Sequence, residues 1–243
     1  MNVVLQRAWE WFQRRPKHPA LLTNEDFFFV FNQNRPIERC DFVVLDTELT
    51  GLNPRRDEIV SIGAVRIRDM RIMVDENFYT CVRTRRALPK ESTLIHRITS
   101  ERVKTAPSLE EVLPEFVEFC GTALLVGHYV GLDMAFLSRA TSKILGGVMH
   151  NPSVDCARLA RAYAANLNRT GQRRMNSDST YQLPKLASEY GLPLFAQHDA
   201  LEDAMQTAYL FVFLAAKLQE HGLSTFRDFR RASEIGLGEE EFL

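Results

Sequence analysis

The sequence predicts an α/β domain in which helices cover both faces of a mixed sheet. Three observations lead to this class. Three β-rich runs come first along the chain, helical patterns then alternate with two short apolar runs, and 45% of the 243 residues are hydrophobic. Consecutive β-rich runs favour antiparallel pairing, whereas strands separated by helices favour parallel pairing. The hydrophobic share is ordinary for a globular protein and is enough for a packed core.

Five runs are expected to form the strands. Residues 42–45 are short and continuously apolar, as in a strand that is buried on both faces. Residues 59–67 and 72–82 are β-rich and are separated by a polar turn, so they should pair as antiparallel neighbours. Two shorter runs, 124–126 and 153–154, complete the five-stranded sheet.

Helices are expected where apolar residues recur at helical spacing. Ser108 is a plausible N-cap for the first of them, and the predicted helices cover 109–119, 132–145, 155–167, 183–190 and 198–218. An additional amphipathic helix is expected at 3–14, ended by Pro16 and Pro19. We therefore divide the chain into an N-terminal helical extension (1–40), a main domain (41–220) and a C-terminal helix with an acidic tail (221–243).

Composition excludes several classes of protein. The net charge of −1 gives no overall attraction to polyanions, so any nucleic-acid binding must come from local basic patches. No apolar run approaches the ~20 residues that span a bilayer, so we expect no membrane association. The four cysteines form no C-x-x-C pair, which argues against zinc and fits a reduced cytoplasm; they are Cys40, Cys81, Cys120 and Cys156.

Two acids follow the first apolar run at positions 46 and 48, just before a turn at Gly51. On an extended chain, residues two apart point the same way, so Asp46 and Glu48 should face one shared site. Ionised groups beside a core are costly unless they are paired or bound to metal. Hard oxygen ligands select Mg²⁺ or Mn²⁺, but an isolated D-x-E is frequent by chance.

Further candidates open two of the predicted helices. Asp133 lies in a first helical turn, where a capping acid is the ordinary interpretation. His198 and Asp203 begin the last long helix, and a spacing of five should make them flank a site near its N-terminus. Their neighbours Asp199 and Glu202 are expected to be solvated. Four carboxylates and a histidine could together bind two divalent cations and provide a general base.

The order of these residues resembles the DEDDh family of 3′–5′ exonucleases, which includes the epsilon proofreading subunit of bacterial DNA polymerase III. Residues 45–52, 127–137 and 198–204 are similar to its three motifs, and residues 95–99 are similar to a substrate-side segment between the first two. The resemblance spans about residues 41–216 and implies an RNase H-like fold.

The resemblance also implies roles for individual residues. Two divalent cations, Mg²⁺ or Mn²⁺, would be held by Asp46, Glu48, Asp133 and Asp203, with His198 as the general base. Substrate contacts would come from Thr50, Gly51, Leu52, His96 and Tyr129. Tyr129 departs from the family, which commonly has Asn there. The reaction would release nucleoside 5′-monophosphates from single-stranded or frayed DNA 3′ ends.

Local charge offers candidate binding surfaces. Residues 83–104 carry seven basic against two acidic residues, which fits either a phosphate-binding patch or a solvated face. The polar loop at 168–182, with Arg169, Arg173 and Arg174, is a second candidate. Residues 192–195 resemble the end of a sliding-clamp-binding peptide, although packing in the core is the preferred interpretation.

Alternative functions stay open at this stage. The substrate could be RNA or short oligonucleotides, which would make the protein an exoribonuclease or oligoribonuclease. The chain could instead be a non-catalytic nucleic-acid-binding accessory subunit of a polymerase, docked through the N-terminal helix and its Trp9 and Trp11. A metal-dependent phosphohydrolase of mononucleotides is a third class.

Overall fold

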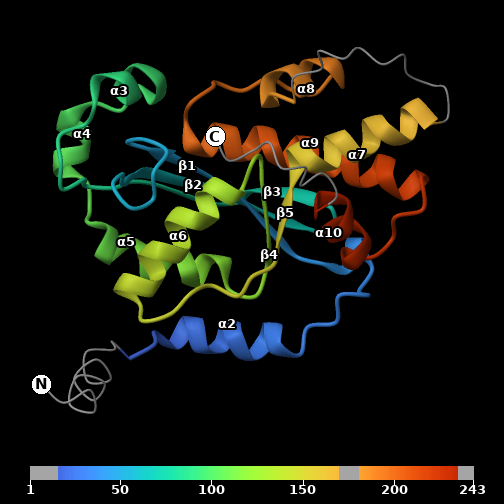
Figure 1. Ribbon diagram of the computed structural model, residues 1–243, viewed down its shortest axis with the longest axis horizontal. Helices are drawn as coiled ribbons and strands as arrows, with labels where there is room; N and C mark the ends of the chain where they lie inside the picture. Colours follow the sequence, from blue (N-terminus) through green and yellow to red (C-terminus); the bar gives the residue numbers. More distant parts are fainter. Residues whose placement is uncertain (1–15, 170–180, 235–243) are drawn as a thin grey trace, which may run out of the picture.

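The computed structural model describes residues 16–169 and 181–234 (Figure 1). The predicted helix at 3–14 with its two tryptophans lies outside these ranges. So do most of the loop at 168–182 and the acidic tail. Within the described ranges, no helix combines the length and apolar character that crossing a membrane requires.

The five predicted strands form one mixed sheet in the order β3-β2-β1-β4-β5. Strand β1 pairs antiparallel with β2 and parallel with β4, β2 pairs antiparallel with β3, and β4 pairs parallel with β5. This confirms the predicted mixed five-stranded sheet. The strands are β1 (Phe42–Leu49), β2 (Ile59–Arg68), β3 (Arg71–Cys81), β4 (Leu124–Gly127) and β5 (Ser153–Asp155).

The first strand is longer than its apolar run. It continues to Leu49 rather than ending at residue 45, because its antiparallel pairing with β2 carries on beyond the apolar residues. Asp46 and Glu48 therefore lie within the strand, opposite Gly63 and Ser61, and not beyond its tip.

The helices predicted from apolar spacing occur within a few residues of their expected bounds. They are α5 (Leu109–Cys120), α6 (Gly131–Ile144), α7 (Cys156–Arg169), α8 (Leu183–Glu189) and α9 (Ala200–Glu220). Ser108 is the N-cap of α5, and the Glu111 carboxylate accepts the Ser108 N–H at 2.7 Å. The C-terminal helix is α10 (Phe226–Glu234). Two short helices were not predicted, α3 (Lys90–His96) and α4 (Ser100–Thr105), because each is too short for apolar periodicity to reveal it.

Helices cover both faces of the sheet (Figure 1). Alternate residues of β1 point to opposite faces, as strand geometry requires. Phe42 and Val44 pack into one core cluster with α7, α8, α9 and α10, whereas Val43 and Leu45 pack into the other with α5 and α6. The sheet is thereby sandwiched between two hydrophobic cores, and its edge at the ends of β1 and β4 stays available for a site.

The N-terminal extension contains helix α2 (Pro19–Phe29), followed by a 3₁₀ turn at Ile37–Arg39. Pro19 was expected to end a helix but begins one, since the first helical position needs no N–H. The buried Asn24 fastens α2 to the domain: its amide donates to Gly121 O at 2.8 Å, and its Oδ1 accepts the His150 N–H at 2.7 Å. The N–H of His18 also donates to Leu145 O at 2.9 Å, so the chain is held in place from about residue 17.

Candidate active site

The start of α9 lies directly on β2, opposite Asp46. A Cβ atom added to Gly63 would stand 2.1 Å from the carbonyl carbon of Ala200, so only glycine permits this approach. Gly63 is the register partner of Asp46. The contact therefore brings the first turn of α9 beside the acids of β1. A glycine inside a strand was the available sequence signal, because it often marks a close backbone approach.

His198 precedes α9 instead of lying in its first turn. Its φ of 63° is left-handed, and the N-cap of α9 is Asp199, whose Oδ1 accepts the N–H groups of Leu201 and Glu202 at 3.1 and 3.3 Å. Asp199 was expected to be solvated, but it is half-buried as this cap. Asp203 Oδ2 in turn accepts the backbone N–H of His198 at 2.8 Å, which fixes the turn that carries the histidine.

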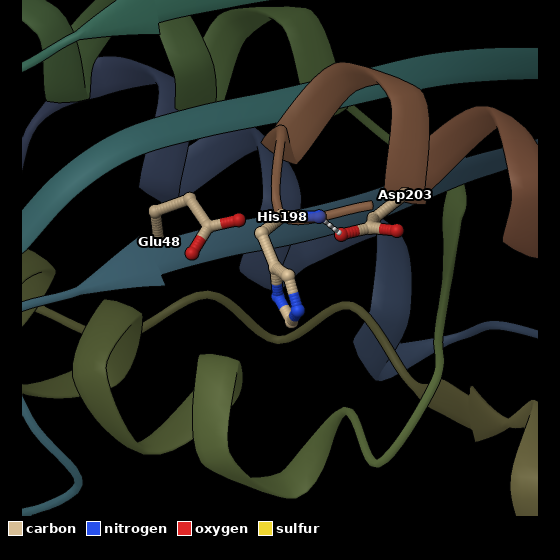
Figure 2. Close-up of side chains that lie close together, drawn as sticks. All are labelled: Glu48, His198 and Asp203. Atoms are coloured by element: carbon tan, nitrogen blue, oxygen red, sulfur yellow. Dashed lines mark hydrogen bonds between the residues drawn. The ribbon is translucent and has the colours of Figure 1, made fainter. Parts of the chain in front are cut away.

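Figure 2 shows Glu48, His198 and Asp203 gathered from β1 and from the start of α9. One potential ligand atom from each of the three lies within 4.8 Å of the others, a group compact enough to hold a metal ion. The imidazole ring of His198 is exposed and makes no hydrogen bond within the described ranges, so it is free to accept a proton or a ligand.

Asp133 reaches the same place from the first turn of α6. It is 7% exposed, and its Oδ1 accepts both the backbone N–H of Thr47 at 3.0 Å and the Thr47 hydroxyl at 2.5 Å. Asp133 is an acid of the first turn of α6, as expected, but it is not the N-cap of that helix, which is Val130. Thr47 was missed by the sequence reasoning, although it stands between the two acids in the sequence and its hydroxyl bond to Asp133 links β1 to α6.

Electrostatics couples the four carboxylates, which we call the acid cluster (Asp46, Glu48, Asp133 and Asp203). Burial, followed by the charges of Asp133, Asp203 and Glu48, raises the pKa of Asp46 well above its usual range. Burial with the charges of Asp203 and Asp199 raises the pKa of Glu48 to about 7.

The other two acids are shifted in the same direction. Burial raises the pKa of Asp133 to about 7 against the opposing effect of the Thr47 hydrogen bonds, and burial also raises the pKa of Asp203. Buried carboxylates that repel one another in this way favour binding a cation to share. An all-oxygen set of this kind suits Mg²⁺ or Mn²⁺.

The predicted substrate residues lie around this cluster. The hydroxyl oxygen of Thr50 accepts the Glu58 N–H at 2.9 Å and so closes the base of the turn between β1 and β2. Gly51 leaves room inside this turn for the Asp57 carboxylate, since a Cβ there would stand 2.5 Å from it and would displace that group. The Leu52 side chain is 77% exposed and is free to meet a ligand.

His96 and Tyr129 complete the predicted set. The Nδ1 atom of buried His96 accepts the Ile98 N–H at 3.0 Å, which leaves the proton on Nε2, and Nε2 has no partner within residues 16–169 and 181–234. Burial lowers the pKa of His96, and nearby His198 lowers it further, so the two histidines lie close together. Tyr129 is 41% exposed and has a left-handed φ of 57°, a conformation that asparagine tolerates better than tyrosine.

A further candidate surface, residues 192–195, is held against α9. The backbone N–H of Phe195 and the carbonyl of Pro193 are both bound by the side chain of Gln206 on α9, which straps residues 192–195 to that helix. Leu192 packs against the core as expected, whereas Leu194 is 66% exposed.

An α/β sheet with carboxylates converging from β1, α6 and α9 defines a nuclease of RNase H-like fold. The exonuclease family model RNase_T matches residues 43–211, and the chain belongs to that family. This confirms the resemblance seen in the three sequence motifs.

Several relatives carry names from bacterial DNA polymerase III. The chain is 31% identical to DNA polymerase III subunit epsilon of Aquifex aeolicus over 78% of its own length and 88% of that protein. It is 36% identical to DNA polymerase III PolC-type of Thermotoga petrophila over 77% of its own length. The chain spans only 13% of that much longer relative.

Solved structures share the fold. Escherichia coli Exonuclease I in complex with a dT13 oligonucleotide superposes with a TM-score of 0.64 at 16% identity, covering 75% of this chain and 42% of that one. Exonuclease X in complex with 5′ overhanging duplex DNA gives a TM-score of 0.58 at 23% identity, covering 79% of this chain and 99% of that one.

Proposed function

We propose that the protein is a metal-dependent 3′–5′ exonuclease that releases nucleoside 5′-monophosphates from single-stranded or frayed DNA 3′ ends. The observation that supports this most is the convergence of Glu48, His198 and Asp203 within 4.8 Å, beside Asp46 and Asp133. Membership of the exonuclease family gives the reaction class. The relatives named as DNA polymerase III components and the neighbours named with DNA favour DNA as the substrate.

The acid cluster would hold two divalent cations, Mg²⁺ or Mn²⁺, which when bound would lower the pKa of a water and stabilise charge on the attacking and leaving oxygens. The protein's own contribution is to hold the carboxylates in place. Thr47 donates twice to Asp133, and the backbone of His198 donates to Asp203, so both acids are oriented before any ligand arrives. Preorganisation of this kind avoids the cost of arranging ligands during the reaction.

His198 is the proposed general base. Its exposed ring lies within reach of the acid cluster and is not engaged elsewhere in the described part of the chain. A histidine changes charge near neutral pH, so it can take the proton of the attacking water and later release it to solvent. We propose that His96, which lies near His198, helps to bind the substrate; its buried Nε2–H has no hydrogen-bond partner among the described residues.

Contacts with the terminal nucleotide are proposed for the turn after β1 and for Tyr129. Leu52 projects into solvent, as do Leu94 and Ile95, which neighbour His96 in α3. Apolar side chains exposed in this way can lie against an unstacked base. Thr50 and Gly51 shape the turn that presents Leu52.

The test is digestion of a 5′-labelled single-stranded DNA and of the matching RNA, each with Mg²⁺, Mn²⁺ or EDTA. A metal-dependent ladder that shortens from the 3′ end of the DNA, and that is absent for Asp46→Ala and His198→Ala, is the expected result. A faster ladder on RNA would favour an exoribonuclease. DNA binding without cleavage under any metal would favour the accessory-subunit alternative.

A DNA polymerase is the proposed protein partner, since the relatives' names refer to polymerase III. The proposed contact is the N-terminal extension with Trp9 and Trp11. Co-purification with a bacterial replicative polymerase that is lost in Trp9→Ala with Trp11→Ala would support it. Co-purification that persists in this variant would mean that the polymerase contacts another surface of the protein.

A further inference from the structure

A cavity of about 290 Å³ begins just after the turn that holds Thr50 and Gly51 and has no role in the proposed chemistry. It is formed by the turn between β1 and β2, the segment after β3, the start of α5 and the second half of α6. In Figure 1 these elements lie together at the left of the view. Its walls come from four stretches of sequence that only the fold brings together.

The cavity carries a concentrated positive charge. Its lining includes three acids, and each is already engaged. Glu58 Oε2 accepts the N–H groups of Arg85 and Arg86 at 3.0 and 3.2 Å, Asp57 Oδ2 accepts the Asn53 N–H at 2.9 Å, and Glu110 pairs with the Arg85 guanidinium at 2.6 Å.

Six basic side chains of the lining remain. All are exposed and none forms an ion pair with a residue of the described ranges. We call this group the basic pocket; it consists of Arg55, Arg56, Arg83, Arg86, Arg139 and Lys143.

The lining holds seven basic side chains against three acids, and this net positive charge points to an anionic ligand. The whole chain has a net charge of −1, so the pocket is a strong local departure from a nearly neutral surface. Like charges gathered around one cavity repel and destabilise the fold unless a polyanion offsets them. The floor is apolar, formed by Ile59, Val82 and Phe136, which gives a surface against which a sugar or base can lie. Arginine-rich rims over such floors suit phosphodiester backbones.

The position of the pocket relates it to the acid cluster. Helix α6 carries Asp133 in its first turn and Arg139 and Lys143 six and ten residues later. At about 1.5 Å per residue these lie ~9 and ~15 Å along the helix, which matches about three to four phosphates of one strand at the ~3.4 Å spacing of duplex geometry. The other wall begins at Pro54, just after the turn that holds Thr50 and Gly51.

We propose that the basic pocket binds backbone phosphates of the nucleic-acid substrate about three to four nucleotides from the reacting 3′ end. This inference rests on the proposed exonuclease function and adds a second anchoring point to it. It makes binding depend on substrate length, because a substrate too short to reach the pocket gains nothing from it.

The test compares oligonucleotide binding and cleavage in the full chain with Arg139→Gln/Lys143→Gln. The matched control is Arg71→Gln/Arg227→Gln, two exposed arginines that do not line the pocket. Fluorescence anisotropy in EDTA measures the Kd of a dinucleotide and of a 20-nucleotide DNA. For the pocket variant, the Kd of the long DNA is expected to rise about tenfold, and its salt slope to fall by about 1.4 at ~0.7 per lost single-strand contact. The Kd of the dinucleotide and its cleavage rate with Mg²⁺ should not change.

Other outcomes would overturn the inference. Equal weakening for the two substrates would mean that the substitutions perturb the catalytic edge, and an unchanged long-DNA Kd would mean that the pocket does not touch DNA. Loss of binding to a free nucleoside 5′-monophosphate, with long-DNA binding intact, would make it a nucleotide site instead. Because binding is measured in EDTA without cleavage, it tests the basic pocket alone. Failure of the exonuclease proposal would be seen only in the cleavage assay with Mg²⁺. Thermal melting checks folding, and relief of repulsion should leave the variant at least as stable as the parent.

Discussion

The N-terminal end of α6 carries a buried acid, Asp133, whereas its C-terminal half carries two exposed bases, Arg139 and Lys143. The acid belongs to a cluster in which neighbouring groups hold the side chains by hydrogen bonds. The bases belong to a pocket in which no described acid holds them. A site that must bind cations at fixed distances needs rigidity, whereas a site that attracts a flexible polyanion needs only charge density.

This difference predicts how the two sites respond to mutation. Single substitutions in the acid cluster should have all-or-none effects, because every member depends on the others. Single substitutions in the basic pocket should have graded effects on DNA binding, because each of the six positive charges contributes separately to the attraction. The predictions below test the first half of that contrast, and the length-dependent binding experiment tests the second.

The largest effect is expected from Asp46→Asn. Removing one ligand charge should lower the exonuclease rate about 10³-fold or more, since a bound cation contributes several kcal/mol and each 1.36 kcal/mol is tenfold. The same change should raise the melting temperature in EDTA, because it relieves the repulsion that raises the pKa of Asp46. Steady-state cleavage and thermal melting measure the two. The control is Asp41→Asn, an exposed position just before β1. A cleavage rate for Asp46→Asn within tenfold of the parent would contradict the all-or-none behaviour expected of the acid cluster.

Gly63→Ala should be next in size. The new Cβ would clash with the backbone of Ala200 and push the start of α9 off β2. Overpacking of this kind costs about 1–3 kcal/mol of unfolding free energy, and a shift of about 1 Å at the catalytic groups costs about 10² in rate. Urea unfolding and kcat are the measurements. Gly131→Ala, where nothing lies within 4 Å of an added Cβ, should be nearly neutral in stability. Equal stability for the two variants would contradict the close approach.

Removing metal should make stability depend on pH. In EDTA, Glu48 and Asp133 keep protons up to a pKa of about 7 when folded, whereas unfolded carboxylates release theirs near pH 4. The folded state then binds more protons between those values, so the free energy of unfolding should fall as pH rises from about 4 to 7. A fall of a few kcal/mol is expected, at ~1.36 kcal/mol per pKa unit.

The measurement is urea unfolding at several pH values, with EDTA and with Mg²⁺. Added Mg²⁺ should reverse the trend by favouring the ionised acids. The pocket variant Arg139→Gln/Lys143→Gln should keep the same pH slope as the parent. If the pH slope of the unfolding free energy changed in this variant but not in Asp133→Asn, the titrating groups would lie in the basic pocket and not in the acid cluster.

The smallest effect is expected from Tyr129→Asn. The left-handed φ of 57° is strained for tyrosine and tolerated by asparagine, so this substitution should stabilise the fold by about 1 kcal/mol or less. Thermal melting measures the gain, with Tyr129→Phe as the control that keeps the strain. A loss of stability would mean that the edge-on contact of the tyrosine ring with His128 stabilises the fold by more than the strained backbone destabilises it.

The sequence revealed the acid cluster but not the basic pocket, for a physical reason. Asp46, Glu48, His198 and Asp203 lie close together within two short motifs, and strand or helix geometry then limits where they can point. Asp199, Thr47 and Gly63 act through contacts made only after folding, so residue type alone did not reveal them.

The charged stretch at 83–104 shows the limit of counting along the chain. It was read as one candidate patch, yet Arg83 and Arg86 line the pocket whereas Arg102 lies over the Tyr79 ring and donates to its hydroxyl. Four of the six residues of the basic pocket come from positions near 55 and 140, which no window of sequence places beside residue 85. The five strands were predictable because β-rich runs persist over several residues, but α3 and α4 were too short to show a period.

Helix α2 has a consequence for how the enzyme can be held. Asn24 and the backbone of His18 fix this helix to the domain on the α5 side of the sheet, so no hinge separates it from the catalytic edge. A protein that bound the extension would therefore also fix the orientation of the active site. The orientation of such a partner relative to the nuclease would be set by the packing of α2 on the domain and by the hydrogen bonds of Asn24 and His18.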